Sequence, residues 1–257
     1  MSQPVALITG CSSGIGRALA EAFQAAGYRV WASARKEDDV RALAEAGFQA
    51  VQLDVNDAAA LARLAGELEV EAAGLDVLVN NAGYGAMGPL LDGGVEAMRR
   101  QFETNVFAVV GVTRALFPLL RRKSGLVVNV GSVSGVLVTP YTGAYCASKH
   151  ALEAFAEALH AELKPFGIQV GTINPGPYQT GFNDRMMETW KRWYDPRRHF
   201  TDYRGVRFPF EQHDPEEMIA SMVALVEAAD GPFRTLLPAS FVEAVRQEQA
   251  RAWERRL

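Results

Sequence analysis

Residues 5–16 read VALITGCSSGIG, a short apolar run that passes directly into a glycine-rich loop. The run Val5–Ile8 has the length and composition of a buried strand. After the loop, apolar residues recur at helical spacing as far as Gly27, a residue type that often ends helices, and residues 29–32 again resemble a strand. The order of strand, glycine loop, helix and strand predicts a βαβ unit.

The glycine loop suits the pyrophosphate group of a dinucleotide. Glycines let the backbone turn tightly and approach the ligand, and the free amides and dipole of the following helix favour negative charge. An ordinary turn with three glycines is the alternative, but the surrounding βαβ pattern favours dinucleotide binding. The cofactor contacts predicted in this loop are Gly10, Ser12, Ser13, Gly14, Ile15 and Gly16.

The rest of the chain alternates strand-like apolar runs with longer helical stretches. This alternation predicts an α/β fold, with one Rossmann-type, doubly wound parallel sheet and helices on both faces. Because 257 residues suit one sizeable domain, we expect a single domain over 1–257. A helix at about residues 215–229 precedes the last expected strand. The strands expected after the first two are residues 50–53, 75–79, 126–130, 168–173 and 233–237.

Composition excludes several classes of protein. The formal net charge of −4 indicates no basic surface of the kind that binds nucleic acid. No apolar stretch approaches the ~20 residues that span a bilayer, and Met1-Ser2-Gln3-Pro4 leads into the first strand without the pattern of a signal peptide. The cysteines and histidines show no metal-ligand spacing, so no metal is implied. We therefore expect a soluble cytoplasmic protein without a nucleic-acid partner.

Tyr145 and Lys149 lie four residues apart, at the start of an apolar-periodic pattern that continues to about Pro165. On a helix, positions i and i+4 share one face, so the phenol and the ammonium can share one site. A free tyrosine has a pKa near ~10, and a nearby cation lowers that pKa because it favours the phenolate. A tyrosine beside a solvated lysine is the alternative, so the pair becomes informative only through the motifs that accompany it.

Three motifs together resemble those of the short-chain dehydrogenase/reductase family. They are Thr9-Gly10-x-x-x-Gly14-x-Gly16, Asn80-Asn81-Ala82-Gly83 and Tyr145-x-x-x-Lys149. The resemblance extends from the first strand to about residue 180. It implies hydride transfer between a nicotinamide cofactor and an alcohol or carbonyl group. The catalytic residues that it implies are Asn105, Ser132, Tyr145 and Lys149.

The resemblance implies a role for each of these four residues. Tyr145 would deliver a proton to the substrate oxygen, Ser132 would hydrogen-bond that oxygen, and Lys149 would lower the pKa of Tyr145 and bind ribose hydroxyls. Asn105 also stands out by itself, because it interrupts an apolar stripe over residues 98–116 and a buried amide needs partners. Related enzymes use this asparagine to hold a water that links the lysine to solvent. A structural amide that bends the helix is the alternative.

The resemblance also implies cofactor contacts beyond the glycine loop. Asp54 would bind the adenine amino group, Asn81 the backbone around the ribose, and Thr180 the carboxamide or the pyrophosphate. The full set outside the loop comprises Asp54, Val55, Asn81, Ala82, Gly83, Tyr145, Lys149, Pro175, Gly176 and Thr180.

The end of the second strand predicts which nicotinamide cofactor binds. An acidic side chain there would accept hydrogen bonds from the ribose 2′-hydroxyl and repel a 2′-phosphate. The chain instead has Ala34, followed by Arg35, whose guanidinium can pair with a phosphate. We therefore expect NADP(H) to be preferred over NAD(H). A solvated Arg35 is the alternative.

Residues 177–213 are expected to form a variable substrate lid. Eight aromatic residues lie between Gly181 and His213, a high density for a chain that is 9% aromatic. Aromatic side chains over a reaction centre would exclude water and favour a bulky apolar substrate. The sequence around Ser132 and Tyr145 resembles that of hydroxysteroid and retinol dehydrogenases and of acyl-dihydroxyacetone-phosphate reductases. The basic residues of the lid are interpreted as a solvated rim rather than a peripheral membrane contact.

These observations predict an NADP-dependent oxidoreductase that interconverts an alcohol with its ketone or aldehyde, on a steroid-, retinoid- or lipid-like substrate. A Rossmann protein that binds NADP(H) to sense redox state, without chemistry, is the alternative. The resemblance further implies a homodimer or homotetramer, formed through the helix of Tyr145 and the long helix before it.

Overall fold

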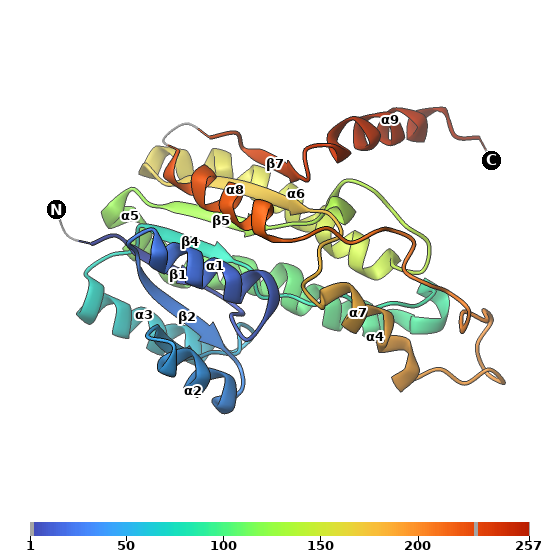
Figure 1. The fold of residues 1–257 in the computed structure, drawn as a ribbon, viewed down its shortest axis with the longest axis horizontal. Helices are drawn as coiled ribbons and strands as arrows, with labels where there is room; N and C mark the ends of the chain where they lie inside the picture. Colours follow the sequence, from blue (N-terminus) through green and yellow to red (C-terminus); the bar gives the residue numbers. More distant parts are fainter. Residues whose placement is uncertain (1–2, 229–230, 257) are drawn as a thin grey trace.

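The computed structural model describes residues 3–228 and 231–256 (Figure 1). In this part of the chain, seven parallel strands form one sheet in the order β3-β2-β1-β4-β5-β6-β7. The chain thus builds outward from β1 in one direction and then from β4 in the other, which confirms the predicted doubly wound fold. The strands are β1 (Val5–Ile8), β2 (Arg29–Ala34), β3 (Gln49–Gln52), β4 (Val77–Asn80), β5 (Leu126–Val130), β6 (Gln169–Pro175) and β7 (Arg234–Leu237).

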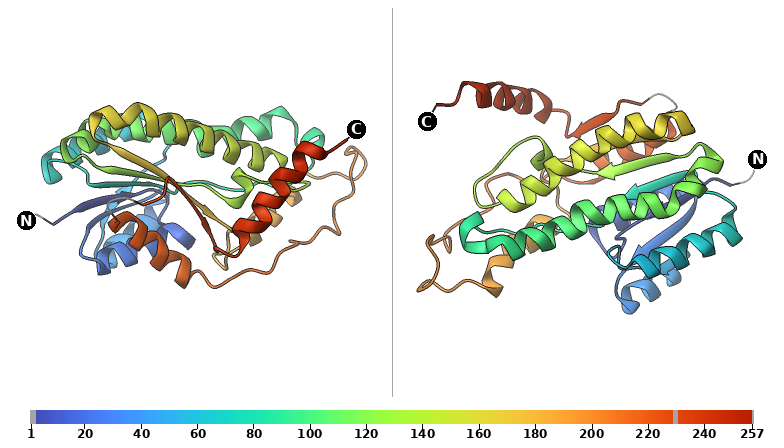
Figure 2. Two further views of the ribbon diagram at one scale, coloured as in Figure 1. Left: turned by 90° about the horizontal axis from the view of Figure 1, so that it is seen from above. Right: turned by 180° about the vertical axis from the view of Figure 1, so that it is seen from behind.

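Helices cover both faces of the sheet. The helices of the described residues are α1 (Gly14–Ala25), α2 (Glu37–Glu45), α3 (Ala58–Ala72), α4 (Leu90–Phe102), α5 (Ala108–Lys123), α6 (Gly143–Leu163), α7 (Phe182–Met187), α8 (Glu216–Glu227) and α9 (Phe241–Glu254). Short helical turns are η1 (Glu103–Phe107), η2 (Val133–Gly135), η3 (Lys164–Phe166) and η4 (Thr189–Arg192). Helices α3, α5 and α6 pack on one face and α1, α2 and α8 on the other (Figure 2). Each face has its own apolar cluster.

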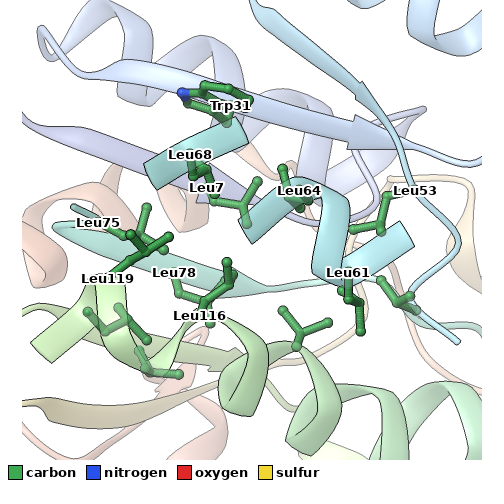
Figure 3. Packing of buried hydrophobic residues seen from close by; sticks show 14 of the residues in the cluster. Leu7, Trp31, Leu53, Leu61, Leu64, Leu68, Leu75, Leu78, Leu116 and Leu119 are labelled. Atoms are coloured by element: carbon green, nitrogen blue, oxygen red, sulfur yellow. The ribbon is translucent and has the colours of Figure 1, made fainter. Parts of the chain in front are cut away.

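The cluster under α3 and α5 shows why the central strands are apolar. Leu64 of α3 and Leu116 of α5 pack with Leu7 of β1 and Leu78 of β4 (Figure 3). On the opposite face, Phe23 of α1 packs in the second cluster, which includes the other side chains of β1. Because helices cover both faces, all four residues of β1 are buried, as expected for a central parallel strand.

The predicted elements agree with the structure to within about two residues at most boundaries. Residues 126–130 are β5 as predicted, whereas the strand expected at 75–79 is Val77–Asn80. The helix expected at 215–229 is α8, and residue 229 lies outside the described residues. The apolar stripe over residues 98–116 runs through the end of α4, the π-helical turn η1 and the first half of α5. Helix α9 was not predicted.

The run from α4 to α5 also changes one expectation from composition. Residues Leu90–Lys123 are long and apolar enough, by length and composition, to cross a membrane, although no such stretch was expected. Half of the most apolar window is buried within the domain, and α5 contributes Val112, Leu116 and Leu120 to the cluster beneath α3. Core helices of globular domains pass the same compositional test.

Candidate active site

A cavity of about 1340 Å³ lies beyond the carboxyl ends of the strands. It is lined by the loops that follow β1 to β6, by the expected lid and by α9. Every predicted site residue except Asn105 lies in its wall. These residues are Gly10, Ser12, Ser13, Gly14, Ile15, Gly16, Arg35, Asp54, Val55, Asn81, Ala82, Gly83, Ser132, Tyr145, Lys149, Pro175, Gly176 and Thr180. The parallel topology thus gathers residues that are distant in the sequence.

The glycine loop is tied to the loop that follows β4. The side chain of Asn81 donates to the carbonyl oxygens of Thr9 at 2.8 Å and Gly10 at 3.1 Å. In return, Thr9 Oγ1 accepts hydrogen bonds from the backbone N–H groups of Asn81 and Ala82, each at 3.0 Å. The two sequence motifs are therefore parts of one structure.

The start of α1 has the shape that a pyrophosphate requires. A Cβ atom on Gly16 would lie 2.4 Å from both Asn81 Nδ2 and Gly10 O, so only glycine fits at this close approach. Gly10 has a φ of +75°, which also favours glycine. The N-cap residue Ser13 makes no side-chain hydrogen bond to the first turn, so the amides there are available to a phosphate. These features fit a bound dinucleotide.

The end of β2 places two cations at the cavity wall. Ala34 is buried, whereas Arg35 and Lys36 are exposed and line the cavity. The side chain of Gln52 in β3 donates to the carbonyl oxygen of Arg35 at 3.3 Å, which fixes the backbone there. Nearby, Asp54 Oδ1 accepts a hydrogen bond from the Asn56 N–H at 3.0 Å. This part of the wall can therefore meet a negatively charged group.

Tyr145 and Lys149 lie one turn apart on α6, and both side chains are buried. Lys149 Nζ donates to the carbonyl oxygen of Val130 at 2.7 Å. Burial lowers the pKa of Lys149 to about 8, an effect that the negative charge of Glu153 opposes. Burial raises the pKa of Tyr145 to about 12, and a hydrogen bond with Ser132 opposes that rise.

Burial therefore outweighs the expected lowering of the Tyr145 pKa by Lys149, and the net shift is upward. The cost of placing a phenolate in an apolar environment exceeds the favourable electrostatic effects on it. Tyr145 thus carries its proton at neutral pH, which suits a proton donor.

Ser132 lies two residues after the end of β5 and is buried. Its Oγ accepts a hydrogen bond from the Ser134 N–H at 3.1 Å, and its carbonyl oxygen accepts one from Asn174 Nδ2 at 3.0 Å. Because Ser132 also shares a hydrogen bond with Tyr145, the two hydroxyl groups meet at the cavity. A substrate oxygen could contact both of them.

Asn105 lies behind the cavity wall, buried within η1. Its Oδ1 accepts a hydrogen bond from the Tyr84 N–H at 3.1 Å, and its Nδ2 donates to Tyr84 O at 3.0 Å and to Ser148 Oγ at 3.1 Å. Both N–H groups of the side chain are thus committed to protein partners. The side chain therefore holds the bend between α4 and α5 and ties it to α6, while the role of Asn105 in holding a water stays a prediction.

An apolar cluster surrounds the Tyr145 ring. Met87 and Met186 are the other buried members, and Phe182 and Phe208 of the expected lid pack against them. Sequence periodicity did not identify the two methionines, because Met87 comes from an irregular loop and Met186 from a helix of only six residues. Phe241 and Val245 of the unpredicted helix α9 also line the cavity.

The eight aromatic residues between Gly181 and His213 comprise two groups and the exposed Phe200. Phe182, Phe208 and Phe210 line the cavity. A second group packs on Tyr203, which is fully buried, with ring centroids 4.8–5.8 Å away in Trp190, Trp193 and Tyr194. None of these four residues lies in the cavity wall described above. They stabilise the lid from within, so fewer aromatic rings face the reaction centre than the composition suggested.

Comparison with known proteins gives consistent results. A family model described as short chain dehydrogenase matches residues 4–191. An uncharacterized oxidoreductase of Escherichia coli strain K12, YbbO, is 41% identical over 189 residues, which cover 73% of this chain and 70% of the relative. The NADPH-dependent 3-dehydrocapnine reductase of Ornithobacterium rhinotracheale is 40% identical over 185 residues, covering 68% and 65%.

A crystal structure of a short chain dehydrogenase from Burkholderia cenocepacia J2315 in complex with NADP has a similar fold. The TM-score is 0.79 at 27% sequence identity, and the match covers 98% of this chain and 95% of that one. The similarity therefore extends beyond residue 191, where the family model ends, to the rest of the lid and the C-terminal segment.

Proposed function

The chain belongs to the short-chain dehydrogenase family, and from that premise we propose that it is an NADP(H)-dependent oxidoreductase that interconverts an alcohol with its ketone or aldehyde. The observation that carries the proposal is the convergence of Ser132, Tyr145 and Lys149 on the cavity that also contains the glycine loop. A proton donor and a dinucleotide site on one cavity suit hydride transfer to a carbonyl group.

Each side chain has its own role in carbonyl reduction. When bound, the reduced nicotinamide supplies a hydride. Ser132 Oγ donates a hydrogen bond to the carbonyl oxygen and positions it, while Tyr145 donates its proton as negative charge develops on that oxygen. The ammonium of Lys149 stabilises the phenolate that remains. Burial keeps the proton on the Tyr145 phenol, which supports the proposal that this residue acts as the proton donor in carbonyl reduction.

The preference for NADP(H) is supported by the end of β2. Arg35 and Lys36 line the cavity there, and no acidic side chain occupies position 34. Guanidinium groups bind phosphate oxygens through charge-assisted hydrogen bonds. The NADPH-dependent relative and the NADP complex of the similar structure agree with this assignment.

The substrate we propose is bulky and apolar, in the manner of a steroid, a retinoid or a lipid. Met87, Met186, Phe182 and Phe208 surround the Tyr145 ring, so the reacting carbonyl would enter an apolar environment. A cavity of about 1340 Å³ is large enough for the cofactor and a sizeable substrate together. Small polar carbonyls would leave this apolar wall uncovered.

The test compares NADPH oxidation by the wild type and by Tyr145→Phe across carbonyl compounds that range from small polar ketones to steroid, retinoid and acyl-chain carbonyls. Loss of the phenolic proton should lower kcat by roughly 10²–10⁴-fold, with an unchanged Kd for NADPH, because the ring remains and only the hydroxyl is removed. Tyr28→Phe makes the same chemical change outside the cavity wall and serves as the control.

Tyr145-dependent turnover of the larger apolar compounds would support both the chemistry and the substrate class. Turnover that survives in Tyr145→Phe would remove Tyr145 from the mechanism. Tight NADPH binding with no turnover of any compound would instead favour a redox sensor.

We further propose a cytoplasmic homodimer or homotetramer, formed through α6 and the α4–α5 run. The support is an exposed apolar surface: Phe107 of η1 is 53% exposed and Phe155 of α6 is 40% exposed, on helices that lie side by side (Figure 2). A second copy of the chain would cover both rings.

A further inference from the structure

Glu153 is a buried carboxylate behind the catalytic site. It lies on α6 one turn after Lys149 and is 5% exposed. Its Oε1 accepts a hydrogen bond from Asn174 Nδ2 at 2.7 Å. Its Oε2 accepts hydrogen bonds from Thr172 Oγ1 at 3.1 Å and from Arg234 Nε at 2.9 Å. Glu153 is absent from the cavity wall and has no part in the mechanism described above.

The surroundings of Glu153 supply hydrogen-bond donors to both of its carboxylate oxygens. A carboxylate buried without partners would be costly, because it loses its hydration. Here a guanidinium, a hydroxyl and an amide all donate to it, and the Arg234 contact is an ion pair. Thr172 belongs to β6 and Arg234 to β7, so the carboxylate joins α6 to the last two strands of the sheet.

The same network reaches Ser132. Asn174 Nδ2, which donates to Glu153, also donates to the carbonyl oxygen of Ser132 at 3.0 Å. A Cβ atom on Gly131 would lie 2.5 Å from Glu153 Oε1, and one on Gly135 would lie 3.1 Å from Glu153 Cγ. The loop that carries Ser132 therefore packs directly on Glu153, and Asn174 links the Ser132 carbonyl to the carboxylate.

Glu153 also acts on Lys149 through its charge. Its negative charge opposes the lowering of the Lys149 pKa by burial. The other titratable groups around this pair are Tyr145 on α6 and Arg234 on β7, whereas β5, β6 and η2 contribute uncharged groups such as the Val130 carbonyl. The protonated form of Lys149 is thus favoured by Glu153, whose charge Arg234 partly offsets through their ion pair.

We propose that Glu153 is a positioning residue of the catalytic site, which fixes the Ser132 loop through Asn174 and places a negative charge one helical turn from the Lys149 ammonium. This inference rests on the proposed function, because it assigns Glu153 a part in the same reaction. Removing the charge should change the rate and its pH dependence without weakening cofactor binding.

Glu153→Gln keeps the size of the side chain and removes its charge. We expect kcat for NADPH-dependent carbonyl reduction to fall about tenfold, because small displacements of a reacting group are costly, with an unchanged Kd for NADPH. Since Lys149 loses a neighbouring negative charge, its pKa should fall by about one unit. The alkaline limb of the kcat profile should therefore move to lower pH.

Arg234→Met changes the charge in the opposite sense. Lys149 then keeps the neighbouring carboxylate, whose charge is no longer offset by the Arg234 ion pair, so its pKa should rise and the alkaline limb should move to higher pH. The Arg234 side chain is 39% exposed, so this variant creates no large internal cavity. The Lys149 pKa can also be measured directly in each full-length variant by NMR of the lysine side chain, which requires no substrate.

Glu157→Gln is the matched control, because it makes the same charge change one turn further along α6 at an exposed position. It should leave kcat and the pH profile unchanged. Shifts of the Lys149 pKa in the same direction in Glu153→Gln and Arg234→Met, or no shift in either, would overturn the inference. Absence of carbonyl turnover in the wild type would contradict the proposed function instead, and opposite pKa shifts would still support the network.

Discussion

Removing the Arg35 side chain tests how the cofactor site distinguishes NADPH from NADH. Arg35→Ala should weaken NADPH binding about 10–100-fold, because a charge-assisted hydrogen bond contributes about 1.5–3 kcal/mol and ~1.4 kcal/mol is a tenfold change in affinity. NADH lacks the 2′-phosphate, so its Kd should be unchanged. Fluorescence titration with both cofactors would measure the two values.

Arg41→Ala is the control for that measurement. Arg41 is also exposed and lies a few residues later, but it forms ion pairs with Glu37 and Asp38 in α2 and lies outside the cavity wall. It should leave both affinities unchanged. An equal loss of NADH and NADPH affinity in Arg35→Ala would assign Arg35 to the fold of the loop rather than to the 2′-phosphate.

The sequence identified Tyr145 and Lys149 but not the protonation state of Tyr145. Their four-residue spacing on a helix is a local property, which the order of residues determines. The pKa of the phenol depends instead on side chains such as Met87 and Met186, which reach it from other parts of the chain. Tertiary packing of this kind leaves no periodic pattern, so the sequence could not show that burial outweighs the effect of a neighbouring cation on the Tyr145 pKa.

At the scale of secondary structure, most strands and helices followed from apolar periodicity, and the exception is informative. Over a single turn, an α-helix and a π-helix place apolar residues similarly, so the stripe over residues 98–116 concealed η1. Asn105 was the one residue in that stripe that indicated a departure, since a buried amide needs partners. Tyr84 and Ser148, which provide them, lie in segments that the sequence alone could not place beside it.

Gly66 in the middle of α3 offers a direct test of helix stability. It is exposed, and a Cβ atom there would meet no atom within 4 Å. Gly66→Ala should therefore increase the free energy of unfolding by about 0.5–1 kcal/mol, because alanine loses less conformational entropy in a helix. Urea unfolding followed by circular dichroism would measure the difference.

Gly125 provides the contrast, because it immediately precedes β5 in a crowded position. A Cβ atom there would lie 2.6 Å from Leu75 O and 2.9 Å from Asp76 O, and backbone cannot move aside easily. The same Gly→Ala change should destabilise the protein at this position. Equal effects of both substitutions on the free energy of unfolding would show that the helix environment of Gly66 does not cause the increase in stability.

For the whole molecule, the exposed rings of Phe107 and Phe155 predict self-association. Sedimentation equilibrium at micromolar concentration should show a dimer or tetramer. Phe155→Glu should shift the association equilibrium toward monomer, because the interface would have to bury an unpaired charge. Val70→Glu is the control, since Val70 is 86% exposed on α3, away from the proposed interface. A monomeric wild type would contradict the proposed assembly.

The strand order has a consequence for folding of the chain during its synthesis on the ribosome. Every strand pair is parallel, so no neighbouring strands can form a hairpin as they emerge. In the register of the sheet, Ala6 of β1 pairs with Val77 of β4, and translation at ~5–20 residues per second leaves roughly 4–14 s between their synthesis. During that interval one edge of an entirely apolar strand has no partner. A nascent chain of this protein is therefore expected to depend on a chaperone near the exit tunnel until β4 has emerged.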